Sequence, residues 1–180
     1  MNGLRFIISP LSFFQVNKYN TINLYNKILD YCDLKGNEVV LDLYCGTGTI
    51  GSFVSKKCNR VIGIELNKYA IEDALKNKKI NNLDNIEFIC GDSGKILKNN
   101  KYKNIYIVIV DPPRMGLSDL SINEILNINS KKIIYTSCDP VTLARDLKKL
   151  SEKYEVKEIT PVDMFPNTYH VESVCVLERK

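Results

Sequence analysis

The chain has 180 residues, of which 44% are hydrophobic and 26% are charged, and its formal net charge is +4. These values predict a folded domain with a hydrophobic core and argue against a disordered chain. No apolar run reaches the roughly 20 residues of a membrane helix, and residues 1–9 lack the features of a secretory signal, so we expect a cytoplasmic protein without a membrane partner. The charge alone is weak support for a nucleic acid partner, because a composition rich in Lys and Asn also produces it.

Short β-branched runs alternate with helical stretches along the chain. A helix is expected first, over Thr21–Cys32. Strands are predicted over Glu38–Tyr44, Arg60–Leu66, Asn85–Cys90, Ile105–Val110 and Lys132–Ser137. The intervening helices are predicted over Ile50–Lys57, Lys68–Asn81, Asp92–Leu97, Leu117–Asn127 and Pro140–Lys153. This alternation predicts a parallel sheet that helices cover on both faces.

The end of the chain breaks this pattern. Tyr154–Val162 and Val171–Arg179 are predicted strands with only a loop between them, which allows antiparallel pairing but no parallel crossover. An α/β fold with a mostly parallel sheet and an antiparallel final strand resembles the class I, Rossmann-like methyltransferases. No repeat, low-complexity tract or linker interrupts the sequence, so we expect residues 1–180 to form a single domain.

A glycine-rich loop follows the first predicted strand. Gly46, Gly48 and Gly51 form a G-x-G-x-x-G pattern, and Glu65 ends the next strand, about 20 residues further on. Glycines let the backbone approach a ligand, and an acidic residue at this spacing suits a ribose. Two ligands fit this pattern, namely a dinucleotide and S-adenosylmethionine.

Two further acidic residues favour S-adenosylmethionine. Asp42 lies inside the first strand, where a carboxylate suits a cationic amino-acid group better than a pyrophosphate, and Asp92 follows the third strand. The alternative is that Asp42 and Asp92 only cap helices or turns. Together with Glu65, they predict a cleft for a cationic nucleoside.

Two more strand ends carry candidate catalytic residues. Asp111-Pro112-Pro113-Arg114 follows the fourth strand, and its prolines hold Asp111 at the carboxyl edge of the sheet, where the sites of α/β proteins lie. Cys138 follows the fifth strand and precedes a helix, whose N-terminus is expected to stabilise a thiolate. We interpret Cys138 as a nucleophile, with a buried structural cysteine as the alternative.

The segment before the last strand adds a candidate base. Glu172 has apolar neighbours, Val171 and Val174, and a partly desolvated carboxylate has a raised pKa. The only histidine, His170, is interpreted as a hydrogen-bonded structural residue.

The six cysteines contain no C-x-x-C pair, so we expect no zinc or iron–sulfur site and no disulfides. Only Cys45 and Cys138 lie in loops with a functional pattern. The other four are interpreted as buried structural thiols, namely Cys32, Cys58, Cys90 and Cys175.

Taken together, these motifs resemble the bacterial RNA uracil-5-methyltransferase family, which modifies tRNA or 23S ribosomal RNA. The resemblance covers nearly the whole chain, and five motifs carry it in the family's order. They are residues 8–17 (ISPLSFFQVN), the glycine loop, and residues 111–116 (DPPRMG), 135–138 (YTSC) and 165–172 (FPNTYHVE). The family's N-terminal RNA-binding regions have no counterpart in this sequence, so we expect a C-terminal catalytic domain. We also expect this domain to be monomeric.

The resemblance implies that the protein methylates carbon 5 of a uridine in RNA, in 23S rRNA rather than tRNA, with S-adenosylmethionine as cofactor. It implies Cys138 as the nucleophile, which forms a covalent bond to carbon 6, and Glu172 as the base. The cofactor contacts implied in this way are Gln15, Tyr44, Thr49, Glu65, Asp92 and Asp111.

Three positions depart from the family's pattern. Thr49 and Asp139 stand where the family often has Asn, and Asn167 stands where Gln, His or Tyr is usual.

Three rival functions remain open at this stage. The first is methylation of another acceptor, such as a cytosine carbon or a ring nitrogen, although the cytosine enzymes keep a cysteine in the proline motif. The second is a non-catalytic RNA-binding module with the same fold. The third is a dinucleotide-dependent oxidoreductase, which would bind NAD and ignore S-adenosylmethionine.

Overall fold

The computed structural model describes residues 3–13, 15, 17–99, 102 and 104–180. Its strands are β1 (Val39–Leu43), β2 (Arg60–Glu65), β3 (Ile86–Cys90), β4 (Ile107–Val110), β5 (Lys132–Ser137), β6 (Tyr154–Val162) and β7 (Glu172–Arg179). Its helices are α1 (Lys18–Cys32), α2 (Thr49–Ser55), α3 (Lys68–Ile80), α4 (Ser93–Asn99), α5 (Asp119–Ile128) and α6 (Pro140–Leu150). Every predicted element is present, with shifts of a few residues at the ends.

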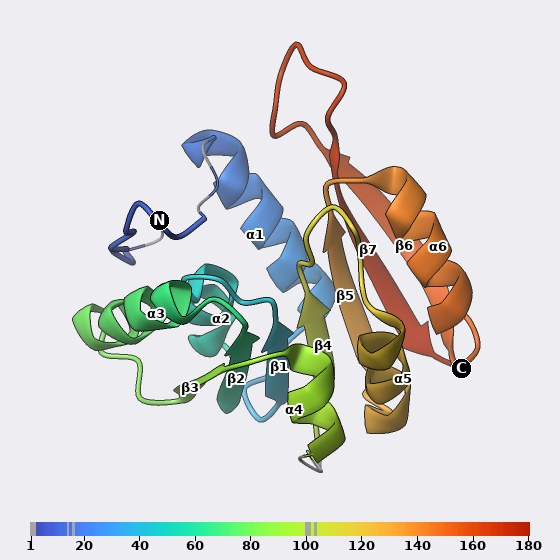
Figure 1. Ribbon diagram of the computed structural model, residues 1–180, viewed down its shortest axis with the longest axis horizontal. Helices are drawn as coiled ribbons and strands as arrows, with labels where there is room; N and C mark the ends of the chain where they lie inside the picture. The colour runs from blue at the N-terminus through green and yellow to red at the C-terminus, as the bar shows by residue number, and fades with distance from the viewer. Residues whose placement is uncertain (1–2, 14, 16, 100–101, 103) are drawn as a thin grey trace.

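Within the described residues the strands form one sheet, in the order β3-β2-β1-β4-β5-β7-β6 (Figure 1). Strands β1 to β5 pair in parallel, whereas β7 is antiparallel to both of its neighbours, β5 and β6. The predicted α/β fold, with a mostly parallel sheet and an antiparallel final strand, is therefore confirmed. The final strand lies between β5 and β6 rather than at the edge.

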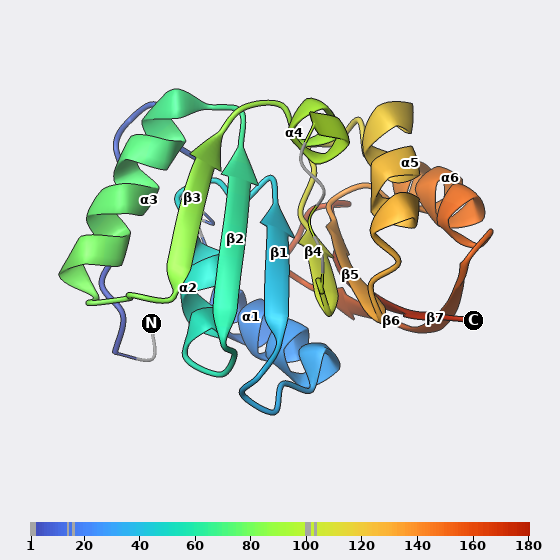
Figure 2. The same ribbon diagram turned by 90° about the horizontal axis from the view of Figure 1, so that it is seen from below.

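Helices cover both faces of this sheet (Figure 2). Apolar side chains of α1 and α2 pack on one face, and those of α4, α5 and α6 pack on the other. All four residues of β4, Ile-Val-Ile-Val, are buried, since both of its faces are covered. This double burial is the physical reason why the central strands read as continuous apolar runs.

Two local predictions are wrong, for reasons that the fold makes plain. Helix α1 begins at Lys18 rather than Thr21, because the side chain of Asn17 caps it and accepts a hydrogen bond from the Asn20 amide at 3.1 Å. Cys90 is exposed rather than buried, because it ends β3, which is an edge strand.

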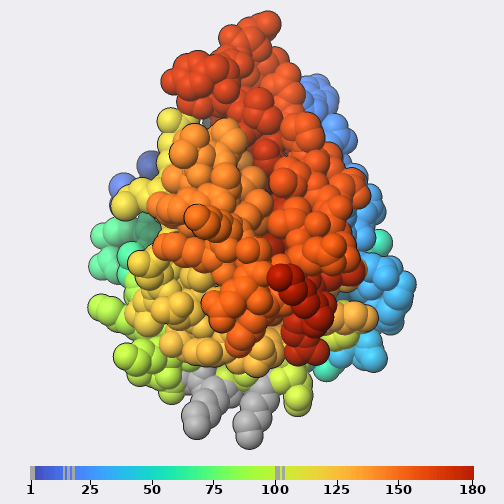
Figure 3. Space-filling model, turned by 90° about the vertical axis from the view of Figure 1, so that its right-hand side faces the viewer, coloured from blue at the N-terminus to red at the C-terminus, as the bar shows by residue number. Residues whose placement is uncertain are grey.

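The loop between β6 and β7, residues 163–171, extends beyond the ends of these strands (Figure 1), and its atoms form the top of the molecule in Figure 3. Among the described residues, the helices are too short or too polar to cross a membrane.

Candidate active site

Four parallel strands, β1, β2, β4 and β5, point their carboxyl ends at a cavity of about 620 Å³. Seven of the eight predicted site residues line it, namely Gln15, Tyr44, Thr49, Glu65, Asp111, Cys138 and Glu172. The carboxyl edge of a parallel sheet is where open α/β proteins bind ligands. The fold therefore brings together residues that lie far apart in the sequence, while their individual roles stay predictions.

Asp92 is the predicted cofactor contact that is not among the described residues lining this cavity. Its carboxylate accepts a hydrogen bond from the Lys95 amide at 2.9 Å, at the start of α4. This is the capping geometry that the sequence left open as the alternative.

Glu65 holds the glycine loop at the edge of the cavity. Its two carboxylate oxygens accept hydrogen bonds from the amides of Gly46, at 3.1 Å, and Asn67, at 2.8 Å. Gly48 has a positive φ of 76°, and a side chain there would collide with Phe88. The loop therefore needs glycine for its backbone conformation and for its packing.

Two predicted contacts are held by hydrogen bonds that the sequence did not indicate. Tyr44 has a positive φ of 61°, which is rare for a residue with a side chain, and its hydroxyl pairs with that of Ser121 at 3.1 Å. The Thr49 hydroxyl pairs with that of Tyr25 at 2.9 Å, and Tyr25 itself lines the cavity. Tyr25 escaped sequence reasoning because its place on α1 is typical of a core residue.

Two buried side chains carry acceptors without a hydrogen-bond partner, namely Asp42, at both carboxylate oxygens, and Gln15, at Oε1. Gln15 lines the cavity, whereas Asp42 is fully buried in β1 and is not among the described residues that line it. Burial, together with the charge of Glu65, raises the pKa of Asp42 to about 7, although the nearby Gly51 amide offsets part of the rise. The Gln15 acceptor, which does line the cavity, favours a ligand that carries a hydrogen-bond donor.

The described residues that line the cavity include three acids, Glu65, Asp111 and Glu172, and one cationic residue, Arg114. Burial raises the pKa of Asp111 well above its ordinary value, and the charges of Glu172 and Asp42 raise it further. Burial also raises the pKa of Glu172, while the Arg114 guanidinium lowers it. This excess of acidic groups suits a cationic ligand such as a sulfonium.

The insertion of β7 next to β5 brings the two predicted catalytic residues together. Ser137 of β5 pairs with Ser173 of β7, so Cys138 and Glu172 lie at adjoining strand ends. Both side chains line the cavity, and the charge of Glu172 contributes to the raised pKa of Cys138. The two residues therefore come together because the antiparallel strand β7 lies next to β5.

The expected stabilisation of a Cys138 thiolate is not found in the structure. Burial is the largest cause of the raised pKa of Cys138, and the charges of Glu172 and Asp111 raise it further. The positive charge of Arg114 lowers it by less than burial and Glu172 raise it. The carboxylate of Asp139 already accepts hydrogen bonds from the first free amides of α6, at Val141 and Thr142. The helix N-terminus is thus occupied by its own cap instead of by the thiolate.

Arg114 links the proline motif to the loop before β7. Its guanidinium donates to the His170 ring, with a distance of 2.8 Å to Nδ1, so His170 is hydrogen-bonded as predicted. Because Arg114 also lowers the pKa of both Cys138 and Glu172, it is a site residue that the sequence analysis did not single out. The signal was present, since Arg114 directly follows the Asp-Pro-Pro motif.

A buried carboxylate fixes the turn of the proline motif. Asp146 of α6 is fully buried and accepts hydrogen bonds from the Leu117 amide, at 2.7 Å, and the Tyr135 hydroxyl, at 2.7 Å. Arg145 forms an ion pair with it at 2.7 Å and donates to the Met115 carbonyl at 2.8 Å. Helix α6, which begins beside Cys138, is therefore tied to the loop that carries Arg114.

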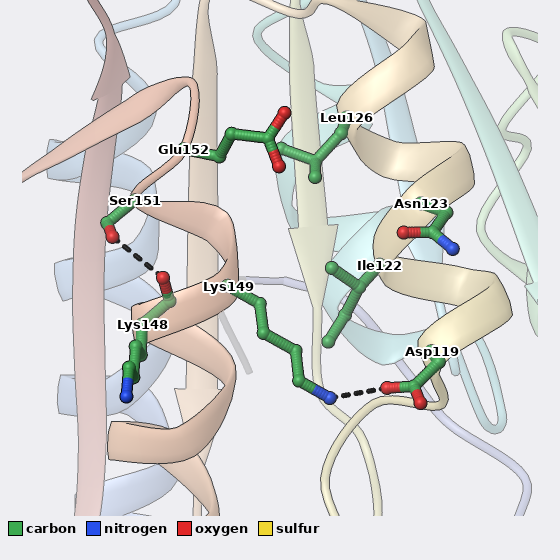
Figure 4. A pocket seen from close by; sticks show the side chains of 8 residues that line it. All are labelled: Asp119, Ile122, Asn123, Leu126, Lys148, Lys149, Ser151 and Glu152. Atoms are coloured by element: carbon green, nitrogen blue, oxygen red, sulfur yellow. Dashed lines mark hydrogen bonds and ion pairs between the residues drawn. The ribbon is translucent and has the colours of Figure 1, made fainter.

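A second hollow, between α5 and α6, lacks such chemistry (Figure 4). Its floor is apolar, with Ile122 and Leu126, and an ion pair between Lys149 and Asp119 crosses its rim. None of the predicted site residues is among the described residues that line it.

Replacing Asp146 by Ala should lower the free energy of unfolding by about 3–5 kcal/mol, because it leaves Arg145 and several donors without their buried partner. Asp119→Ala is the matched control, since it removes an exposed ion pair, and its effect should be about 1 kcal/mol or less. Urea unfolding of both variants measures the difference. Equal losses would mean that Asp146 does not anchor the loop.

The strand order, the glycine loop and the acidic cavity at the strand ends define a class I methyltransferase fold. The model of the tRNA (uracil-5-)-methyltransferase family matches residues 4–180, and the chain belongs to this family.

Relatives and solved structures agree with this assignment. The chain is 49% identical to an RNA methyltransferase of Clostridium tetani and 50% identical to one of Caldanaerobacter subterraneus, over 98% and 99% of its length. It also matches the crystal structure of a Pyrococcus abyssi tRNA (uracil-54, C5)-methyltransferase in complex with S-adenosyl-L-homocysteine, with a TM-score of 0.86 and 39% identity over 97% of this chain. The chain spans 39%, 40% and 42% of these three proteins, respectively.

Proposed function

We propose that this chain is the catalytic domain of an enzyme that methylates carbon 5 of a uridine in RNA through a covalent bond between Cys138 and carbon 6 of the base. The observation that carries the proposal is that Cys138 and Glu172, from adjoining strand ends, line one acidic cavity together with Asp111 and Arg114. A nucleophile, a base and a binding cavity for a cationic cofactor are the parts that this reaction needs.

The cofactor proposed for the cavity is S-adenosylmethionine, which supplies a methyl group on a positively charged sulfur. Glu65 and the glycine loop would hold its ribose, and the unpaired acceptor of Gln15 would face one of its donors. Tyr44, Thr49 and Asp111 line the same cavity and complete the proposed contacts.

The Cys138 sulfur makes the first bond in the proposed mechanism. The thiol gives its proton to water, and the thiolate attacks carbon 6 of the uracil. The carbon 5–carbon 6 π bond opens into an enolate whose carbon 5 is nucleophilic. The cofactor would supply the methyl group, with the bond between that methyl and the cofactor sulfur breaking as the bond to carbon 5 forms. Because a stacked base hides carbon 6, the target uridine must be unpaired or flipped into the cavity.

Glu172 acts last in this sequence. Its carboxylate takes the proton from carbon 5, the carbon 5–carbon 6 double bond returns, and the bond from Cys138 to carbon 6 breaks. Burial, with only 5% of the residue exposed, raises the pKa of Glu172 and makes it a better proton acceptor than an exposed carboxylate.

The RNA that carries the target uridine is the open part of the proposal. The sequence favours 23S rRNA over tRNA, whereas the Pyrococcus abyssi relative is a tRNA enzyme. Mapping 5-methyluridine in cellular RNA with and without the gene distinguishes the two. Loss of the modification from 23S rRNA alone supports the sequence-based preference, and loss from tRNA alone contradicts it.

S-adenosylhomocysteine should bind the chain and raise its melting temperature by about 5–10 °C at a hundredfold excess over its dissociation constant, because a ligand of the native state stabilises it. Glu65→Ala should weaken binding about tenfold or more, since it removes a charged acceptor from the loop. Glu87→Ala, which breaks the exposed ion pair with Arg60, is the control and should leave binding unchanged.

Calorimetry measures the binding of S-adenosylhomocysteine by the wild type and by both variants. An oxidoreductase would bind NAD instead, so binding of NAD without S-adenosylhomocysteine would overturn the proposed function.

A further inference from the structure

The N-terminal segment, residues 3–13, runs along α3 over residues 4–9 and then turns at residues 10–12 (Figures 1 and 2). Three side chains spaced four residues apart, two on α3 and one at its C-cap, bind the backbone of the N-terminal segment at every second residue. The pairs are Asn81 with Arg5, Asn77 with Ile7, and Asp73 with Ser9. Four helical residues rise about 6 Å and two extended residues span about 6.7 Å, so the two rows stay in step.

Each asparagine side chain in this row bonds both the amide and the carbonyl of one residue, as a neighbouring strand would. Asn77 accepts from the Ile7 amide at 2.7 Å and donates to the Ile7 carbonyl at 3.1 Å. Asn81 accepts from the Arg5 amide at 2.9 Å and donates to the Arg5 carbonyl at 2.7 Å. The segment therefore has a defined register on α3.

Asp73 fixes the end of the row nearest the cavity. Its carboxylate accepts from the Ser9 amide at 2.7 Å and the Ser12 hydroxyl at 2.9 Å. Burial opposes ionisation, but these donors and Lys76 outweigh it and lower the pKa of Asp73 to about 2. The anchor is thus ionised at every pH at which binding would be measured.

Asn77 also reaches the glycine loop. It is fully buried, and its amide donates to the carbonyl of Thr47, between the two loop glycines, at 3.1 Å. A single side chain thereby joins α3, the N-terminal segment and the glycine loop. The segment ends at Phe13, which lines the cavity, so its register on α3 bears on where this wall of the cavity lies.

We propose that Asn77 is a positioning residue for the cofactor, because it holds two walls of the cavity, the glycine loop and the N-terminal segment, in their binding arrangement before the ligand arrives. This inference rests on the proposed cofactor binding. It predicts that loss of the Asn77 bonds weakens binding of S-adenosylhomocysteine by more than the accompanying loss of stability explains.

Asn85→Ala provides the matched control for Asn77→Ala. The Asn85 amide also donates to two backbone carbonyls, those of Ser55 and Cys58, at 2.7 and 3.0 Å. It lies before β3, at the opposite end of the strands from the cavity. The two variants therefore lose the same kind of hydrogen bond at different distances from the cavity.

A second pair of variants leaves the buried asparagine in place. Ile7→Pro removes the amide that Asn77 binds, at a residue that is 46% exposed. Ile8→Pro is its control, since the Ile8 amide is out of phase with the row and makes no hydrogen bond within the described residues.

The experiment is calorimetry of S-adenosylhomocysteine on the full chain, with urea unfolding and hydrogen exchange of the amides of Ile7 and Ser9. Asn77→Ala and Ile7→Pro should weaken binding about tenfold or more, and Asn77→Ala should speed exchange at both amides. Asn85→Ala and Ile8→Pro should bind as the wild type does.

Three outcomes are decisive. Normal binding by Ile7→Pro would overturn the inference, even if Asn77→Ala does not fold. Equal weakening in Asn77→Ala and Asn85→Ala would also overturn it, because binding would then follow stability alone. A wild-type chain that does not bind S-adenosylhomocysteine would instead overturn the proposed function.

Discussion

Replacing Cys138 by Ala should abolish both RNA methylation and the covalent link to RNA, with a fall in turnover of roughly four orders of magnitude or more. The physical reason is that carbon 5 of uracil becomes nucleophilic only after a bond forms at carbon 6. Binding of S-adenosylhomocysteine should remain, because Glu65, the glycine loop and Gln15 are unchanged. Denaturing electrophoresis of the full-length enzyme with 5-fluorouridine RNA and cofactor measures the link, since fluorine cannot leave as a proton.

Cys45→Ala is the matched control for this experiment. Cys45 also lines the cavity, but it is buried in the glycine loop, and burial together with the charges of Asp42 and Glu65 raises its pKa well above the ordinary value. The variant should still form the slow-migrating band. A band that persists in Cys138→Ala and disappears in Cys45→Ala would make Cys45 the nucleophile.

The pH dependence of link formation follows from the raised pKa of Cys138. The thiolate is the attacking species, and only a small fraction of the thiol is ionised at neutral pH. Below that pKa, the rate should rise about tenfold per pH unit. A rate that is flat from neutral pH upward would mean that the bound RNA lowers the pKa or that another step limits the rate.

Most of the site residues could be predicted from the sequence because they lie at the ends of predicted strands. Glu65, Asp111 and Cys138 each follow an apolar run, and parallel strands bring their carboxyl ends to one edge. The order of the last two strands is not visible in this pattern, since a hairpin fixes direction but not position. That Cys138 and Glu172 lie at adjoining strand ends therefore becomes visible only once β7 is seen between β5 and β6.

Polar side chains that bind backbone are the other part that sequence reasoning misses. The Asp92 carboxylate accepts a hydrogen bond from the Lys95 amide. The Asp139 carboxylate accepts one from the Thr142 amide, at the helix N-terminus that was expected to stabilise Cys138. Asn77 carries no sequence signal, because an asparagine on a helix is ordinarily an exposed polar residue. Burial and hydrogen-bond partners decide such cases, and both depend on the tertiary structure.

Replacing Glu172 by Gln should stop the reaction after methyl transfer, with turnover lowered by about 10²- to 10⁴-fold. Glutamine keeps the shape of the side chain but cannot take the carbon 5 proton, so the methylated adduct should accumulate. Denaturing electrophoresis with ordinary uridine RNA and S-adenosylmethionine should then show a slow-migrating band that the wild type lacks. Loss of all adduct in this variant would assign Glu172 an earlier role, such as holding the uracil edge.

Mass spectrometry of that trapped adduct tests the central proposal most directly. Trypsin would release residues 133–145, which contain Cys138 as their only cysteine. After nuclease digestion of the RNA, this peptide should carry a uridine nucleotide with one added methyl group. A nucleotide on the Cys45 peptide, or an adduct on Cys138 without the methyl group, would contradict the proposed roles of Cys138 and Glu172.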